Sequence, residues 1–206
     1  MELPDPPLLV ISDRSQARLP LIDIAEATFR GGCRWFSLRE KDLPAEERRA
    51  LLSELVVRGR RCGATVIAHE DVDAVEAAGA GGVHLPSGGD PAAVRQRLPH
   101  ALIGVSTHSA EEAAAQLRAG ADYVTLSPIF LTDSKPGYGP ALGLDALAAA
   151  AWMASGPIVA LGGVGPENAA ACLTAGAHGI AAMGEIMRAA DPEAAVRRLA
   201  AAMLSK

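Results

Sequence analysis

Two kinds of hydrophobic pattern alternate along the whole chain. Short runs of apolar, often β-branched residues are typical of strands that are buried on both faces. Longer segments rich in Ala, Leu, Glu and Arg are typical of helices. The predicted strands are residues 8–12, 35–39, 65–68, 82–85, 102–106, 123–128, 157–162 and 179–184. A predicted helix follows each strand, at residues 20–31, 44–61, 72–79, 91–98, 109–119, 142–154, 166–175 and 191–204.

A short internal repeat supports this alternation. The sequences AGAGGV at 78–83, AGADYV at 119–124 and AGAHGI at 175–180 each indicate a glycine that ends a helix and leads into a strand. Eight such units, with strands that are apolar throughout, predict parallel strands covered by helices. We therefore expect a compact (β/α)₈ TIM barrel that forms a single domain over residues 1–206. An open, doubly wound sheet is the alternative, although it rarely needs eight evenly spaced units.

Composition and charge narrow the choice of partners. The chain of 206 residues is 50% hydrophobic and carries a net charge of −5, which argues against nucleic acid, since phosphate contacts need clustered Lys and Arg. The three cysteines are widely spaced and form no CxxC pair, so we expect buried free thiols. No leader-like or membrane-spanning apolar segment is present in the sequence, and we expect a cytoplasmic protein with no membrane partner. The sequence is compatible with a homo-oligomer.

Two glycine-containing turns follow the last two predicted strands. Gly162 and Gly163 end one strand, and Met183 and Gly184 end the next. Backbone N–H groups at a strand-to-helix turn bind anions, and glycine allows the anion to approach closely. Two such turns at the ends of strands seven and eight form a recurring phosphate site in barrels. We therefore predict a small phosphorylated ligand bound by these four residues.

Other polar residues also follow predicted strands, where barrels place their chemistry. Arg39 and Lys41 could bind an anion or simply pair with the acidic residues beside them. His108 could donate and accept protons, or only pack beside a helix cap at Ser109. His69 and Ser106 are further candidates for substrate binding. By contrast, His84 lies within a strand and is interpreted as a core histidine.

A long polar loop follows the sixth predicted strand. Residues 129–142 contain Thr132, Ser134 and Lys135 among several glycines. Loops of this length in compact domains are usually functional, although a disordered connector would look similar. We predict that these three side chains bind the substrate.

Together, these motifs resemble the thiamine phosphate synthase/TenI superfamily over essentially the full chain. The matching segments are LREKD at 38–42, GVHL at 82–85, GVSTHS at 104–109, GADYV at 120–124, SPIFLTDSK at 127–135 and VALGGV at 159–164. The resemblance implies the same (β/α)₈ barrel and a role in thiamin biosynthesis.

The resemblance also distinguishes two branches of the superfamily. The synthase branch joins a thiazole phosphate to a pyrimidine pyrophosphate with Mg²⁺, and it has a glutamine, an Asn-Asp pair and an aspartate where this chain has Ser37, His69-Glu70 and Gly89. Because the missing carboxylate argues against a metal site, the resemblance favours the TenI branch, whose members act as thiazole tautomerases.

That branch implies a metal-independent isomerase with no cofactor, in which His108 moves the proton while Arg39, Lys41 and Lys135 hold the substrate's carboxylate. The alternatives are a thiamine phosphate synthase that uses Mg²⁺, and a regulatory or binding protein without catalysis.

Overall fold

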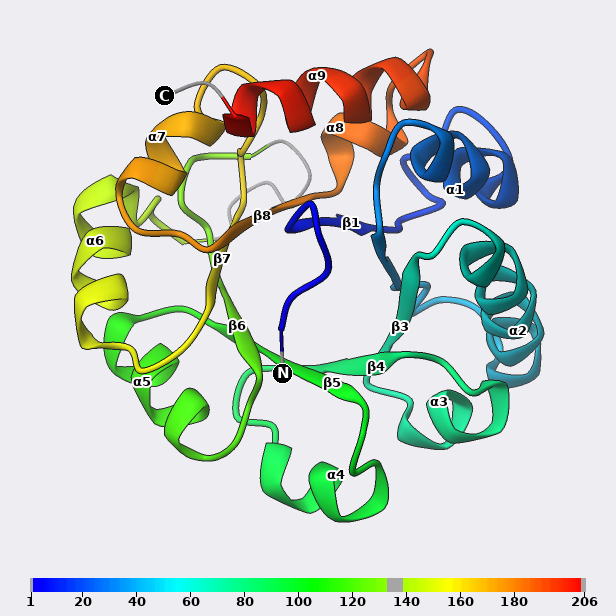
Figure 1. Cartoon of the computed structure of the whole chain (residues 1–206), viewed down its shortest axis with the longest axis horizontal. Coiled ribbons are helices and arrows are strands. Elements are labelled where there is room, and N and C mark those ends of the chain that lie inside the picture. Colours follow the sequence, from blue (N-terminus) through cyan, green and yellow to red (C-terminus); the bar gives the residue numbers. More distant parts are fainter. Residues whose placement is uncertain (1, 133–138, 205–206) are drawn as a thin grey trace.

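Eight parallel strands close into a barrel in a computed structural model that describes residues 2–132 and 139–204. Neighbouring strands pair in chain order, and β8 pairs with β1 (Figure 1). The predicted (β/α)₈ barrel is therefore confirmed, and the open sheet is excluded because the sheet has no edge. The strands are β1 Leu8–Ile11, β2 Trp35–Leu38, β3 Thr65–His69, β4 Gly82–Leu85, β5 Leu102–Thr107, β6 Tyr123–Leu126, β7 Ile158–Leu161 and β8 Gly179–Ala182.

The helices form an outer ring around the strands (Figure 1). They are α1 Leu21–Arg30, α2 Ala45–Arg61, α3 Val72–Ala78, α4 Pro91–Arg97, α5 Ala110–Arg118, α6 Gly143–Met153, α7 Ala169–Thr174, α8 Gly184–Met187 and α9 Pro192–Leu204. Each predicted helix is present with slightly shorter bounds. The sequence pattern did not predict α8, because a helix of one turn is too short to show a 3.6-residue period.

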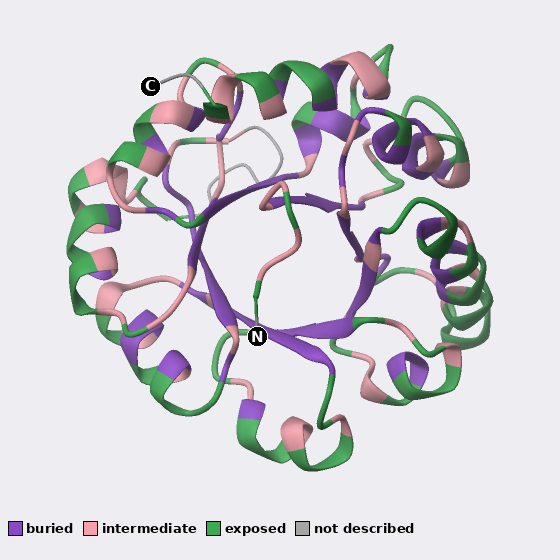
Figure 2. Cartoon of the chain, in the orientation of Figure 1, coloured by how far each residue is buried: buried purple, intermediate pink, exposed green. Residues whose placement is uncertain are grey.

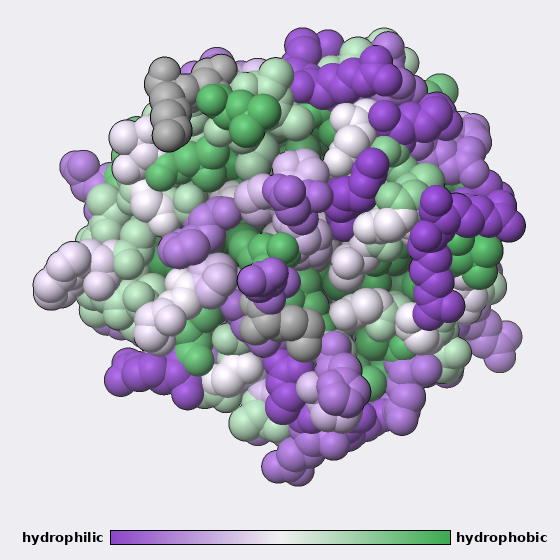
Figure 3. Space-filling model, viewed as in Figure 1, coloured by the Kyte–Doolittle hydropathy of each residue, from purple (hydrophilic) through white to green (hydrophobic). Residues whose placement is uncertain are grey.

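The strands separate two apolar layers. Leu8 and Val10 belong to the larger layer between strands and helices, whereas Leu9 and Ile11 belong to a smaller cluster inside the barrel. Successive strand residues point to opposite sides of the sheet, which explains the apolar runs without alternation. Figure 2 shows the same arrangement as a continuous buried ring of strands, with the buried faces of the helices turned inward. Hydrophilic side chains gather at the outer rim over α2 and α9 (Figure 3).

The N-terminal segment covers the end of the barrel at which the strands begin. Residues 2–7 cross this end (Figure 1), and Leu3 packs against the apolar cluster inside the barrel. His178 also lies at this end, where its backbone N–H donates to the carbonyl of Ile158, as expected for a structural residue. The end at which the strands finish is therefore left for the chemistry.

The cysteines and the expected absence of a membrane-spanning helix can also be compared with the structure. Cys33 and Cys172 are buried free thiols as predicted, but Cys62 is exposed at the end of α2, so that part of the expectation is wrong. In residues 2–132 and 139–204, no helix has the length and apolar character needed to cross a bilayer.

Candidate active site

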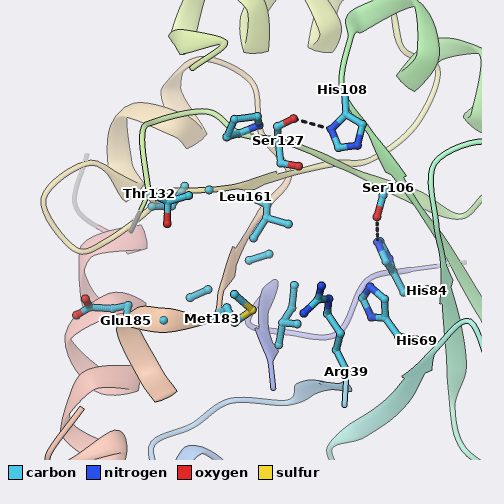
Figure 4. A pocket seen from close by; sticks show the side chains of 18 of the residues that line it. Arg39, His69, His84, Ser106, His108, Ser127, Thr132, Leu161, Met183 and Glu185 are labelled. Atoms are coloured by element: carbon cyan, nitrogen blue, oxygen red, sulfur yellow. Dashed lines mark hydrogen bonds between the residues drawn. The ribbon is translucent and has the colours of Figure 1, made fainter. Parts of the chain in front are cut away.

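A cavity of about 530 Å³ opens where the strands end. Each strand, or the residue that follows it, contributes to its wall, as barrel closure requires. The contributing residues, from β1 to β8, are Ile11, Arg39, His69, His84, Ser106, Ser127, Leu161 and Met183. Figure 4 labels all of these except Ile11 and shows them around one common space.

The structure brings most of the predicted site residues together at this cavity. The lining includes Arg39, Lys41, His69, Ser106, His108, Thr132, Gly162, Gly163, Met183 and Gly184. Ser134 and Lys135 lie outside the described residues. Chain order along the barrel therefore placed the described candidates correctly, while their roles remain predictions.

Arg39 supplies positive charge to the cavity from the end of β2. Its backbone N–H donates to Ser12 Oγ at 2.8 Å, and its side chain points into the cavity (Figure 4). Next to it, the buried carboxylate of Glu40 accepts from the backbone N–H of Arg14 at 3.1 and 3.2 Å. Burial raises the pKa of Glu40. These contacts tie the loop after β1 to the end of β2, so the backbone beneath Arg39 is held in place.

Lys41 already has an ion-pair partner. Its Nζ lies 2.6 Å from Glu70 Oε1, and both side chains are about half exposed. Glu70 has a φ of 62°, which is uncommon outside glycine. An exposed pair of this kind contributes at most about 1 kcal/mol, so an anion can compete for the lysine.

The first glycine turn has the geometry predicted for an anion site. Gly162 and Gly163 have φ values of 94° and 62°, and a Cβ on Gly163 would lie 2.4 Å from the carbonyl oxygen of Leu131. Asn168 holds the turn from both sides, accepting from Gly165 N and donating to Gly163 O, each at 2.9 Å. Within the described residues, the N–H groups of Gly163 and Val164 donate to no protein acceptor. They are therefore available to a phosphate oxygen.

The second turn is formed by Met183 and the first residue of α8, Gly184. Arg188, at the end of α8, also lines the cavity, together with Glu185 and Glu167. Sequence reasoning missed these three residues. Arg188 could have been predicted because it follows Gly184 by one helical turn. The sequence around Glu185 and Glu167 gives no comparable signal.

His108 is held in one tautomer by the loop after β6. Its Nδ1 lies 2.8 Å from the carbonyl oxygen of Ser127, and a carbonyl can only accept, so Nδ1 carries the hydrogen. The backbone N–H of His108 donates to Glu112 at 2.8 Å, and Ser109 caps α5. Ser109 is therefore the helix cap, as one interpretation had it, and His108 lines the cavity, while its role in proton transfer stays a prediction.

Two further histidines lie side by side on β3 and β4. Their ring centroids are 4.8 Å apart, and Ser37 Oγ is 3.2 Å from His69 Nδ1. His84 is buried as predicted, with Nδ1 2.9 Å from Tyr123 Oη and Nε2 3.0 Å from Ser106 Oγ. Burial, together with the nearby charge of Arg39, lowers the pKa of His84 to about 3. The imidazole is therefore neutral at physiological pH.

The carboxylates near the cavity do not form a site for a divalent cation. Among the described residues, no group of three or more His, Cys, Asp or Glu side chains is arranged around a common point. Glu70 is paired with Lys41, and its neighbour Asp71 accepts from Arg48 at 3.1 Å. At position 89 a glycine stands where the synthase branch has an aspartate, and a Cβ there would lie 2.7 Å from Leu85 Cβ. Mg²⁺ prefers several oxygen ligands, which these residues do not offer together.

Comparison with known proteins identifies the family. The family model described as thiamine monophosphate synthase matches residues 8–186. A putative thiamine-phosphate synthase of Geobacter sulfurreducens is 41% identical over 94% of this chain and 92% of its own length. A thiamine-phosphate synthase of Roseiflexus sp. is 39% identical over 95% of this chain and 84% of its own length. Among solved structures, thiamine phosphate pyrophosphorylase from Pyrococcus furiosus superposes with a TM-score of 0.86 at 29% identity, covering 95% of this chain and 94% of that one.

These relatives overturn the predicted activity. The expectation of a thiazole tautomerase, and hence of a metal-independent isomerase, is wrong, because relatives about 40% identical over most of both chains are named synthases. The expectation rested on carboxylates that the synthase branch has and this chain lacks. Their absence bears on how a cation is held, and it does not show how many anionic substrates bind. The preference for the TenI branch receives no support either. The chain belongs to the thiamine monophosphate synthase family.

Proposed function

We propose that this protein is a transferase that joins a pyrimidine diphosphate to a thiazole phosphate, forming thiamine phosphate and releasing pyrophosphate. The printed names of its relatives support this reaction. The remaining question is which residues of this chain receive the two substrates.

The observation that carries the proposal is the similarity to synthases over most of the chain, and the cavity has two anion-binding features that suit the two substrates of that reaction. Arg39 and Lys41 follow β2, whereas the glycine turns follow β7 and β8. The tautomerase expected from the sequence would use both features for the carboxylate and the phosphate of one molecule, and the names of the relatives favour the transferase. A transferase with a diphosphate and a monophosphate substrate needs both, and it gains rate by holding them close together.

We assign the monophosphate to the glycine turns and the diphosphate to the two cations. The N–H groups of Gly163 and Val164, together with the turn at Met183 and Gly184, would bind the monophosphate. The guanidinium of Arg39 would form charge-assisted hydrogen bonds to the diphosphate, and Lys41 would leave Glu70 to do the same. These bonds would also stabilise the charge that develops on the pyrophosphate as it leaves.

The relatives' reaction implies Mg²⁺, but the carboxylates in residues 2–132 and 139–204 do not provide a protein-held site for it. Neutralisation of the diphosphate by this chain therefore falls to Arg39 and Lys41. Their charges act in the same cavity in which the substrates meet.

The direct test is to incubate the purified protein with hydroxymethylpyrimidine diphosphate and hydroxyethylthiazole phosphate, with and without added Mg²⁺. We expect thiamine phosphate and pyrophosphate to appear in equal amounts. Omission of either substrate is the control. Failure to form thiamine phosphate under all these conditions, in protein shown to be folded, would contradict the proposal.

A further inference from the structure

A chain of hydrogen-bonding side chains runs from the barrel interior to the cavity. Tyr123 on β6 and His84 on β4 are fully or almost fully buried, whereas Ser106 on β5 is half-buried and lines the cavity. The distances along this chain are 2.9 Å from Tyr123 Oη to His84 Nδ1 and 3.0 Å from His84 Nε2 to Ser106 Oγ. Figure 4 shows the last step, with the ring of His84 pointing at Ser106.

Burial decides which ring nitrogen of His84 carries the hydrogen. Within the described residues, His84 Nδ1 is the one acceptor within reach of the Tyr123 hydroxyl. If Nδ1 carried the hydrogen, the hydroxyl hydrogen of Tyr123 would be buried without an acceptor, at a cost of about 1–3 kcal/mol. Tyr123 therefore donates to Nδ1, and the hydrogen of His84 lies on Nε2. There it can be shared between Ser106 Oγ and Thr125 Oγ1, which is 3.3 Å away.

The position of Tyr123 is itself fixed by packing. A Cβ on Gly104 would lie 2.0 Å from Tyr123 Cζ, so the absence of a side chain at 104 makes room for the phenol ring. Trp35 packs edge-on against the same ring, with centroids 4.6 Å apart. Tyr123 cannot turn away from His84 without losing these contacts.

We propose that Tyr123 and His84 are positioning residues that make Ser106 a hydrogen-bond donor toward the substrate. Because His84 Nε2–H donates to Ser106 Oγ, the serine's own hydrogen must point elsewhere, and the cavity lies on its open side. Ser106 therefore favours a substrate whose atom facing the serine accepts a hydrogen bond and carries no hydrogen of its own. A ring nitrogen and a phosphoryl oxygen both meet this requirement. The binding part of this inference rests on the proposed function, but the tautomer assignment does not.

Nuclear magnetic resonance tests the tautomer on the intact protein. In protein labelled with ¹⁵N at histidine, long-range ¹H–¹⁵N correlation spectra distinguish a nitrogen that carries hydrogen from one that does not. In the unmodified protein we expect His84 to carry its hydrogen on Nε2. We expect the ring nitrogen signals of His84 to change in Tyr123→Phe, which removes only the hydroxyl that donates to Nδ1. Thr107→Val is the control, since it removes a nearby buried hydroxyl that bonds to the Thr125 carbonyl instead. Hydrogen on Nδ1 in the unmodified protein would overturn the inference whatever the enzyme's activity.

A double-mutant cycle tests whether Tyr123 acts through Ser106. Affinity for thiamine phosphate is measured by calorimetry in Ser106→Ala, in Tyr123→Phe and in the double variant. We expect each single variant to bind about 3–10-fold more weakly, as for loss of one neutral hydrogen bond, and the double variant to bind no more weakly than Ser106→Ala. If the double variant instead loses affinity by the product of the two single losses, Tyr123 acts independently of Ser106. That result would overturn the proposal.

Inorganic pyrophosphate provides the second arm of the same experiment. If Ser106→Ala weakens the binding of pyrophosphate as well, the acceptor is a phosphoryl oxygen. If only thiamine phosphate is affected, the acceptor is a ring nitrogen or a monophosphate oxygen and not an oxygen of the diphosphate. If Ser106→Ala binds both probes as tightly as the unmodified protein does, Ser106 donates no hydrogen bond to either, and the proposal is overturned. Because calorimetry and spectroscopy need no turnover, failure here is distinguishable from absence of synthase activity.

Discussion

The imidazole of His108 is oriented by the backbone carbonyl of Ser127, whose oxygen lies 2.8 Å from Nδ1. The two residues belong to neighbouring strand ends, β5 and β6, and both line the cavity. The bond places the hydrogen on Nδ1 and makes Nε2 an acceptor in the neutral ring. His108 thus enters the site with a defined hydrogen-bonding role.

Replacement of His108 should weaken catalysis moderately. In a transferase whose leaving group is pyrophosphate, the ring binds and orients rather than moving a proton between ring atoms. We expect His108→Asn to lower kcat/KM by about 3–10-fold, as for one neutral hydrogen bond. The control is His100→Asn, an exposed position before β5. A loss of about 10²-fold or more would instead indicate general acid–base catalysis.

Arg39 should matter more than Lys41 for binding pyrophosphate. A charge-assisted hydrogen bond contributes about 1.5–3 kcal/mol, so Arg39→Ala should weaken binding by about 10–150-fold. Lys41→Ala should have a smaller effect, since binding must first break the 2.6 Å pair with Glu70. Calorimetry with inorganic pyrophosphate measures both, and Arg61→Ala on the exposed side of α2 is the control. Equal, small losses in both variants would contradict the assignment.

Asn168 should be needed for the shape of the phosphate turn. Asn168→Ala removes both hydrogen bonds that hold residues 163–165, so the turn should loosen and bind thiamine phosphate several-fold more weakly. Thr174→Val in the same helix, α7, is the control. Replacement of Gly163 is less informative, because a Cβ would collide with the backbone at Leu131 and distort the loop directly. Unchanged affinity in Asn168→Ala would argue against phosphate at this turn.

The protein alone should bind Mg²⁺ weakly. Glu70 is paired with Lys41, position 89 is a glycine, and the described part of the chain contains no group of carboxylates arranged to bind the ion. Calorimetric titration with MgCl₂ in the absence of substrates should show no binding in the micromolar range, and Glu70→Gln should leave the result unchanged. Micromolar affinity that disappears in Glu70→Gln would reveal a protein-held site.

Acid should destabilise the fold partly through His84. Burial lowers its pKa in the folded protein to about 3, below the ordinary value of 6.5 that applies when the chain is unfolded. Between these values the unfolded chain binds the extra proton, so stability is complete above pH 6.5 and falls as pH falls toward 3. The contribution approaches about 1.4 kcal/mol per pH unit.

Urea unfolding at pH 5, 6 and 7 measures this slope. We expect His84→Gln to reduce the loss of stability between pH 6 and pH 5, although the variant is itself less stable. His100→Gln should retain the slope of the unmodified protein, because His100 is exposed. A slope unaffected by His84→Gln would contradict the assignment of a neutral, buried imidazole.

The sequence by itself determined the barrel and the positions of most candidates for the site. Apolar runs separated by helical segments require parallel strands with both faces covered, and chain order then places Arg39, Ser106 and His108 at the same end. Local chemistry also indicated the glycine turn at 162–163, because few other residues suit a turn with positive φ. These features depend on periodicity and on neighbouring residues, which a sequence shows directly.

The tertiary structure decided which of these side chains act together. Tyr123 and His84 are 39 positions apart, and Lys41 and Glu70 are 29 apart, so their contacts follow from strand register and barrel closure rather than from local pattern. The same closure brings the cations and the glycine turns to one cavity. The predicted activity was wrong because it rested on carboxylates that the synthase branch has and this chain lacks, whereas relatives about 40% identical are named synthases. Side-chain partners and charge at the site depend on contacts between distant segments, which only the folded barrel brings together.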